Sequence, residues 1–513
     1  MQPSASLPEP HAFIRPVQIA AVPGPSTPLV DRVLAGVERA LLRRGHRWVT
    51  TPDDATDAFV TSARLHDPRP WRDSPMFTGR KRFGLARKPA NYAFVQVPLA
   101  ELTALLRGFE QALAKERPGP DDFGHPGLSA NAWQVLLDQG RRGGAMMCVG
   151  RLLQAQAKSL RVVMVVGDER PIAAHLFDLA GAYPRIDAQD PERFYDEMAL
   201  RIATHLSTRE VTNHDNDREP IPADVWRRAP GPDAMLRVSR ELGRRRFFTN
   251  MVRISDLVDV PAITGTIARQ YSEGCFGTHD PVIGAQIVTI TGSRNPVEKA
   301  SLMEDDLAVI QGVLDDGSGV LVRAVEGLRN EPPSSEAVEF ELVDRYLPRM
   351  RLPQEFGVDT EVPVVRSKLH GHRGVVSFDP GVVEYVPLDE PFFHYLVSCS
   401  TEAQAKGVTA AFARSQALRD AADPRTIVFT VLPGHGLLMA EKWVVGTRPF
   451  DVLLRAMDDG TIEIGDGVPQ GPMRYECEGG RMVLRLGNGT VQPSDGLRPA
   501  RVRDDGSYGA NAG

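Results

Sequence analysis

The chain has 513 residues, 42% hydrophobic and 25% charged, which is the composition of a soluble globular protein with about two to four domains. Its net charge of −6 disfavours a general nucleic-acid-binding protein, which usually carries a basic surface. No apolar run approaches the roughly 18 residues of a membrane helix, and the N-terminus lacks the pattern of a signal peptide. We therefore expect a cytoplasmic protein without a nucleic-acid or membrane partner.

Strand and helix patterns alternate through the first two hundred residues. Residues 1–13 are rich in proline and serine and are expected to be disordered. A strand pattern at 17–22 precedes an amphipathic helix pattern at 29–44, and a strongly apolar strand pattern recurs at 160–166. This alternation predicts a Rossmann-like α/β domain over residues 14–207 with a mainly parallel sheet. Its motifs do not indicate what this domain does.

The chain changes character after residue 207. Residues 208–235 are polar and hold four prolines, which is typical of a linker. Residues 236–465 alternate between strand, loop and helix patterns and form the second predicted domain. Residues 466–513 predict a small β extension that ends in a glycine-rich, disordered tail.

Three histidines of the second domain have a spacing that suits a metal site. His370 and His372 stand two residues apart in an apolar strand pattern, so both imidazoles are expected on one face of the strand. His435 lies between two glycines after another apolar strand pattern, where its neighbours would not obstruct a ligand. Three histidine ligands with an open fourth position are typical of catalytic zinc.

An acidic residue and two serines form a second motif. Glu336 follows Ser334 and Ser335 directly, after two prolines. Two readings stay open, because such serines can cap a helix or bind an anion such as a phosphate. Upstream, a strand pattern ends in Thr291 and Gly292, which alone indicates only a β-turn.

Lysines offer an alternative chemistry, because a buried lysine can form a Schiff base with a carbonyl substrate. Lys299 and Lys368 are the candidates, and alternation along the strand places Lys368 and Arg366 on the face of His370. A solvated lysine at a strand end is the simpler interpretation of Lys368. Cys275 and Cys399 lack a suitably spaced histidine and are interpreted as small buried residues.

The order of these motifs resembles the class II aldolase/adducin family, which includes fuculose-phosphate aldolase and ribulose-phosphate epimerase. The resemblance covers about residues 245–450 and rests on the following stretches: TITGS (289–293), MEDDLAVI (303–310), SSE (334–336), HGH (370–372) and GHG (434–436). It implies an α/β/α domain with a mixed, largely antiparallel central sheet, and a homo-oligomer.

The resemblance also assigns roles to individual residues. It implies that His370, His372 and His435 bind a divalent metal, with Zn²⁺ as the expected ion, and that Glu336 is the general acid/base. Tyr395 would protonate the departing alkoxide, with Tyr385 as a second candidate. The substrate phosphate or carboxylate would be bound by Thr291, Gly292, Ser334 and Ser335.

The implied activity is that of a metal-dependent carbon–carbon lyase acting on a hydroxylated ketone or a sugar phosphate through a metal-stabilised enediolate. Two alternatives remain open. The same scaffold can serve an epimerase or a dehydratase, and adducin-like members of the family are binding modules without enzymatic activity.

Overall fold

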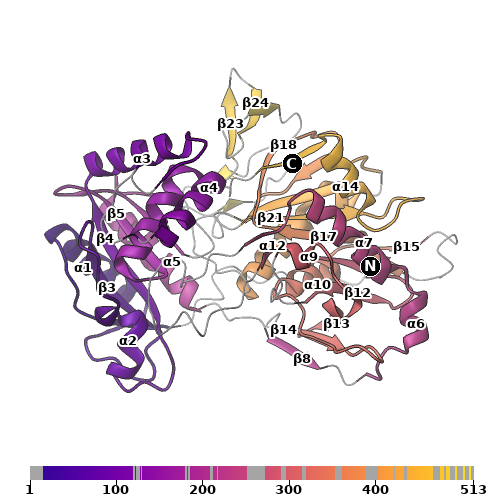
Figure 1. The fold of residues 1–513 in the computed structure, drawn as a ribbon, viewed down its shortest axis with the longest axis horizontal. Helices are drawn as coiled ribbons and strands as arrows, with labels where there is room; N and C mark the ends of the chain where they lie inside the picture. The colour runs from indigo at the N-terminus through magenta and orange to yellow at the C-terminus, as the bar shows by residue number, and fades with distance from the viewer. Residues whose placement is uncertain are drawn as a thin grey trace.

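The computed structural model is a mixed α/β structure with one large sheet in each of two lobes (Figure 1). It describes residues 16–119, 122, 128, 130–178, 182, 185–207, 212–215, 218–250, 272–290, 296–314, 319–352, 361–388, 402–420, 422–432, 436–465, 474–478, 481–485, 491–493, 501–502 and 508–509. No helix among these residues has the length and apolar character needed to cross a membrane.

In the first lobe, the described strands form a seven-stranded sheet in the order β2-β1-β3-β4-β5-β6-β7. The pairs from β2 to β5 are parallel, and β6 and β7 are added antiparallel at one edge, as expected for a mainly parallel sheet. The strands are β1 (Gln18–Ala21), β2 (Arg47–Val49), β3 (Ala58–Arg64), β4 (Ala90–Val97), β5 (Arg161–Gly167), β6 (Pro171–Phe177) and β7 (Ile186–Asp187).

Helices cover both faces of this sheet. The apolar residues of α1 recur every three or four positions, and Thr27 caps the helix by accepting from the amide of Val30 at 3.3 Å. Helices α1 and α5 share one apolar core with the sheet, and α3 and α4 share another. The helices are α1 (Pro28–Arg43), α2 (Pro75–Arg82), α3 (Leu99–Leu113), α4 (Ala130–Ala157) and α5 (Pro191–Ser207).

In the second lobe, the described strands form a nine-stranded sheet in the order β19-β20-β21-β17-β11-β12-β13-β14-β8. Only the outermost pairs, β19 with β20 and β14 with β8, are parallel. The strands are β8 (Thr212–Asp215), β11 (Cys275–Asp280), β12 (Ala285–Thr289), β13 (Leu307–Val313), β14 (Gly319–Arg323), β17 (Val365–Gly371), β19 (Val383–Tyr385), β20 (Ile427–Leu432) and β21 (Gly436–Lys442).

This second sheet lies between two helical layers with separate apolar cores. One core joins the sheet to α7 (Pro230–Arg244) and α14 (Asp451–Asp458). The other joins it to α10 (Ala337–Tyr346), α12 (Glu402–Arg414) and the short α13 (Gln416–Arg419). Because side chains alternate between the two faces along each strand, the position of a polar residue in its strand decides which of the two helical layers it faces.

Part of the expected linker is regular structure. The segment 208–235 holds β8, helix α6 (Ala223–Arg228) and the first residues of α7. The polar composition of this segment does not predict a strand. β8 forms because it pairs with β14 at the edge of the sheet, and that pairing is not visible in the local sequence.

Smaller elements complete the second lobe and the C-terminal extension. They are β9 (Thr249–Asn250), β10 (Ser272–Glu273), α9 (Pro296–Lys299), the 3-10 helix Glu304–Asp306, β15 (Arg349–Arg351), β16 (Glu361–Pro363), β18 (Gly374–Phe378), β22 (Ile462–Gly465), β23 (Arg474–Glu478), β24 (Arg481–Arg485), β25 (Val491–Pro493), β26 (Arg501–Val502) and β27 (Tyr508–Gly509).

Candidate functional site

Two predicted metal ligands lie side by side at one end of β17. His370 is the penultimate residue of the strand, and His372 follows it in the bend before β18. Their ring centroids are 5.1 Å apart and the rings are inclined by 70°. Both side chains are at most 6% exposed. The strand ends earlier than the sequence suggested, but the two imidazoles still approach one another.

The hydrogen bonding of His370 fixes its tautomer. Its Nδ1 lies 2.9 Å from the carbonyl oxygen of Leu437 on β21, and a carbonyl only accepts, so Nδ1 carries the proton. The lone pair is then on Nε2. Burial lowers the pKa of His370 to about 4, so the ring is neutral at pH 7. A neutral histidine whose second nitrogen donates to a carbonyl is the usual form of a metal ligand.

Glu336 immediately precedes α10, and both serines before it donate to its carboxylate. The hydroxyl oxygens of Ser334 and Ser335 lie 2.5 and 3.2 Å from Oε2. Glu336 itself occupies the N-cap position of α10, and its side chain makes no capping hydrogen bond to the first turn. The structure therefore favours a carboxylate held by the serines over the interpretation of serines as helix caps.

The environment of Glu336 keeps it ionised. Burial alone would raise the pKa of its carboxyl group, but the positive charge that His370 acquires when it is protonated at low pH, together with the hydrogen bond from Ser334, lowers it more. The net result is a pKa below the ordinary value. Glu336 and His370 are thus close enough to interact electrostatically, as a general base beside a metal ligand would require.

Three further residues reach this cluster, two of them not identified from sequence. Cys275 on β11 is the direct register partner of His370 on β17. Burial is the main cause, and the charge of Glu336 the second, of a thiol pKa far above the usual value. Lys299, considered as a Schiff-base residue, is 3% exposed, and its ammonium group donates to the carbonyl of Gly274. Glu339 follows Glu336 by one helical turn, a spacing visible in the sequence.

Lys368 shares the sheet face of His370 but is bound elsewhere. It is fully buried, and its Nζ lies 2.5 Å from Oδ1 of Asp344 on α10. The amide of Gln286 donates to the other oxygen of Asp344. This pairing makes Lys368 part of the packing between β17 and α10.

The expected position of Arg366 was wrong, because a β-bulge changes the alternation. The register of β17 against β21 shifts between Val365 and Ser367. The Arg366 guanidinium lies 4.6 Å from the centroid of Trp443 and donates to the carbonyl of Thr447 at 2.6 Å. It therefore faces away from His370.

Tyr385, the second candidate for an acid, does not join the cluster. It lies in the apolar core on the α7 and α14 side of the sheet, with its ring centroid 5.2 Å from that of Phe429. His370 and Glu336 belong to the α10 side. Of the two proposed tyrosines, only Tyr395 stays a candidate.

Four predicted site residues lie outside the described residues: Thr291, Gly292, Tyr395 and His435. Described residues close in sequence to His435 and to Thr291 lie at the cluster. A Cβ on Gly436, next to His435, would lie 2.7 Å from the Cα of His372. The amide of Ser334 donates to the carbonyl of Thr289 at 2.8 Å, close to Thr291 in sequence.

The described residues fit a metal site only in part. Within the described part of the chain, no group of three or more His, Cys, Asp or Glu residues is arranged to hold a metal ion. His370 and His372 suit two of the ligands, because their rings are adjacent and His370 presents Nε2 as a neutral donor. The third ligand expected from the sequence, His435, lies outside the described residues.

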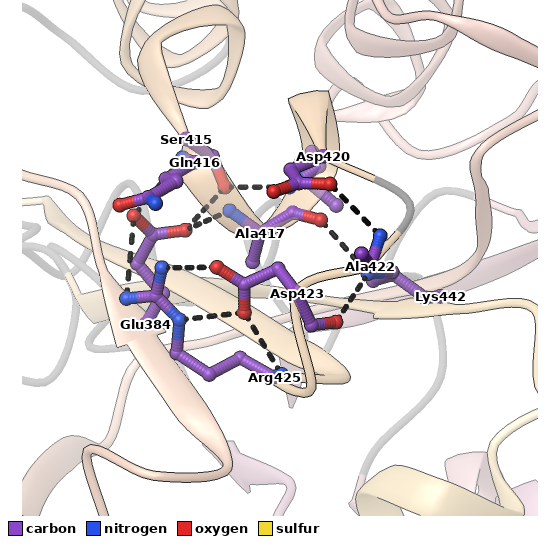
Figure 2. Close-up of polar contacts among 10 residues, drawn as sticks. Glu384, Ser415, Gln416, Ala417, Asp420, Ala422, Asp423, Arg425 and Lys442 are labelled. Atoms are coloured by element: carbon purple, nitrogen blue, oxygen red, sulfur yellow. Dashed lines mark hydrogen bonds and ion pairs between the residues drawn. The ribbon is translucent and has the colours of Figure 1, made fainter.

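A second polar cluster on the same sheet face is structural (Figure 2). The carboxylate of Glu384 accepts from the hydroxyl of Ser415 at 2.5 Å and from the amide of Ala417 at 2.8 Å. Arg425 binds Asp423 through two hydrogen bonds and lies 3.7 Å from Glu384. These contacts hold the start of α13 against β19.

Comparison with protein-family models, with curated proteins and with solved structures gave no match to this chain, so the comparisons assign neither a family nor a fold family.

Proposed function

We propose that the second lobe is a metal-dependent carbon–carbon lyase that cleaves a hydroxylated ketone or a sugar phosphate. The observation that carries the proposal is the meeting of His370, His372 and Glu336 in one buried place. The two rings are 5.1 Å apart, and the carboxylate is held beside them by Ser334. The order of motifs that resembles the class II aldolases supports the same assignment.

The histidines would hold the metal. His370 offers Nε2, His372 is its neighbour, and His435 is the proposed third ligand, with Zn²⁺ as the expected ion. When bound, the ion would supply Lewis-acid stabilisation of the negative charge that develops on an enediolate oxygen.

The protein's own residues would move the protons. Glu336 is ionised and buried, so it can take a proton from the substrate and return it to the enediolate carbon. Ser334 and Ser335 orient its carboxylate by donating to one oxygen. Tyr395 would protonate the departing alkoxide. Contacts of Thr291, Gly292 and the serines to a substrate phosphate or carboxylate belong to the same proposal.

The same arrangement would also serve an epimerase or a dehydratase, because all three reactions pass through a stabilised carbanion beside a carbonyl group. Product analysis with a panel of hydroxy-ketones and sugar phosphates separates them. Cleavage yields two carbonyl products, epimerisation preserves the mass and dehydration loses water. An adducin-like binding module without activity would convert none of the panel.

Metal content tests the proposal most directly. We expect about one zinc or other divalent ion per chain in untagged protein, and none in the His370→Ala/His372→Ala double variant. The matched control is His66→Ala, which removes an exposed histidine of the first lobe and should retain the metal. Equal metal content in the double variant, or no metal in the parent after reconstitution, would contradict the proposed site. The expected homo-oligomer is tested on the same samples by light scattering.

A further inference from the structure

A second carboxyl group lies beside Glu336. Glu339 is in the first turn of α10, three residues after Glu336, whose backbone is already helical. Side chains three residues apart on a helix are neighbours, with Cβ atoms about 5–6 Å apart. Glu339 is 1% exposed, so it is as deeply buried as the residues of the apolar core around it.

The partners of Glu339 are neutral or acidic. Gln404 on α12 donates to Oε1, while Oε2 is buried and has no hydrogen-bond partner within the described residues. Two titratable groups act on its side chain: Glu336, at the start of the same helix, and the thiol of Cys275, on β11. The described ion pairs include none with Glu339. A buried carboxylate in such surroundings would be strongly unfavourable.

The two carboxyl groups are therefore unequal. Burial and, after it, the charge of Glu336 raise the pKa of Glu339 to about 8, while the pKa of Glu336 is below its ordinary value. At neutral pH one group carries a proton and the other carries a charge. Opposite shifts in adjacent carboxyl groups are typical of acid and base pairs in active sites.

We propose that Glu339 is a positioning residue of the site, which holds a proton beside Glu336 and so keeps the pair at a single negative charge. This inference rests on the proposed function for its catalytic meaning. With one charge shared by the pair, Glu336 can stay ionised as a base without a repelling neighbour. Above about pH 8 the second proton leaves and the site gains a further negative charge.

Infrared spectroscopy tests the protonation directly. A protonated carboxyl group has a carbonyl stretch separate from the bands of carboxylates, so it can be followed from pH 6 to pH 10 in metal-free full-length protein. We expect a band with a midpoint near pH 8 that Glu339→Gln removes. The matched control is Glu341→Gln, on the same helix, whose pKa of about 7 is raised by burial and by Asp344. That control should remove a different band, with a midpoint near pH 7.

A metal titration adds a second readout. Zinc affinity of the parent should rise several-fold more between pH 7 and pH 9 than that of Glu339→Gln, because only the parent gains a charge. Glu339→Asp should keep part of this rise. If Glu339→Gln does not fold, ¹³C-labelled glutamate in the parent must still show one carboxyl resonance titrating near pH 8.

A carboxyl band unchanged in Glu339→Gln, or no glutamate titrating near pH 8 besides Glu341 and Glu441, whose pKa values are about 7, would overturn the inference. Failure of the proposed function is distinguishable. Absence of metal from the parent would remove the lyase, whereas the infrared band would still decide whether Glu339 holds a proton.

Discussion

The buried pair of Lys368 and Asp344 leads to a prediction about stability. Lys368 has no exposed surface, and its Nζ lies 2.5 Å from the Asp344 carboxylate, which also accepts from Gln286. Burial raises the pKa of Asp344, and the nearby Lys368 offsets only part of this rise. Replacing Lys368 by methionine would keep the apolar stem but leave a buried carboxylate without its cation.

Breaking a buried ion pair on one side typically costs about 3–5 kcal/mol, and we expect this loss in Lys368→Met at pH 7. The loss should be smaller at pH 5 than at pH 7, because burial raises the pKa of Asp344 and a carboxyl group that takes up a proton no longer carries an uncompensated charge. Each unit of pKa shift corresponds to about 1.4 kcal/mol. Lys368→Met/Asp344→Leu removes both charges and should recover most of the stability.

The assay is urea unfolding of the full chain, followed by circular dichroism at both pH values. The reasoning fails if Lys368→Met costs less than about 1 kcal/mol at pH 7, since breaking a buried pair should cost about 3–5 kcal/mol. It also fails if the double variant is no more stable than the single one. Zinc content of the double variant should equal that of the parent, because Lys368 acts in packing and not as a Schiff-base residue.

Two further predictions concern the second sheet. Gly436→Ala should destabilise the protein more than Gly460→Ala and lower its zinc content, because a Cβ at residue 436 would lie 2.0 Å from the carbonyl oxygen of Gly371. At Gly460 (φ +80°) nothing lies within 4 Å, so the matched control should cost only the roughly 1–2 kcal/mol of a left-handed backbone. Burial raises the pKa of Glu441 from 4.5 to about 7, so the folded state holds its proton longer than the unfolded state does. This residue should therefore contribute a loss of about 3 kcal/mol of stability as the pH rises from 4.5 to 7, in addition to the contributions of Glu339 and Glu341. Glu441→Gln should reduce the slope in urea unfolding by that amount, and an unchanged slope would refute the assignment.

The sequence was informative where chemistry and local pattern coincide. The spacing of His370 and His372 and the position of Glu336 before a helix follow from strand and helix periodicity, and the structure brings these residues together. Cys275 and Gln404 reach the cluster only through the pairing of distant strands and the packing of α12 on α10. No local pattern carries that information.

Two other features depended on irregular or long-range structure. The side of the sheet that Arg366 faces is set by a bulge, which shifts the two-residue period without a glycine or proline to indicate it. β8 consists of polar residues that form a strand because β14 offers an open edge. The first case shows that alternation predicts the face of a side chain only while the register is regular. The second shows that an edge strand can depend on its partner strand rather than on its own sequence pattern.

The place of β8 decides how the chain can be divided. This strand precedes every other element of the second lobe and pairs along the outer edge of β14, whose backbone groups would otherwise be open to a strand from another molecule. A fragment beginning at residue 236 would lose β8, α6 and the bond from the Gly231 amide to Asp280, and should aggregate through the bare edge of β14. A fragment beginning at residue 212 keeps that edge covered and is the natural unit for expressing the second lobe alone.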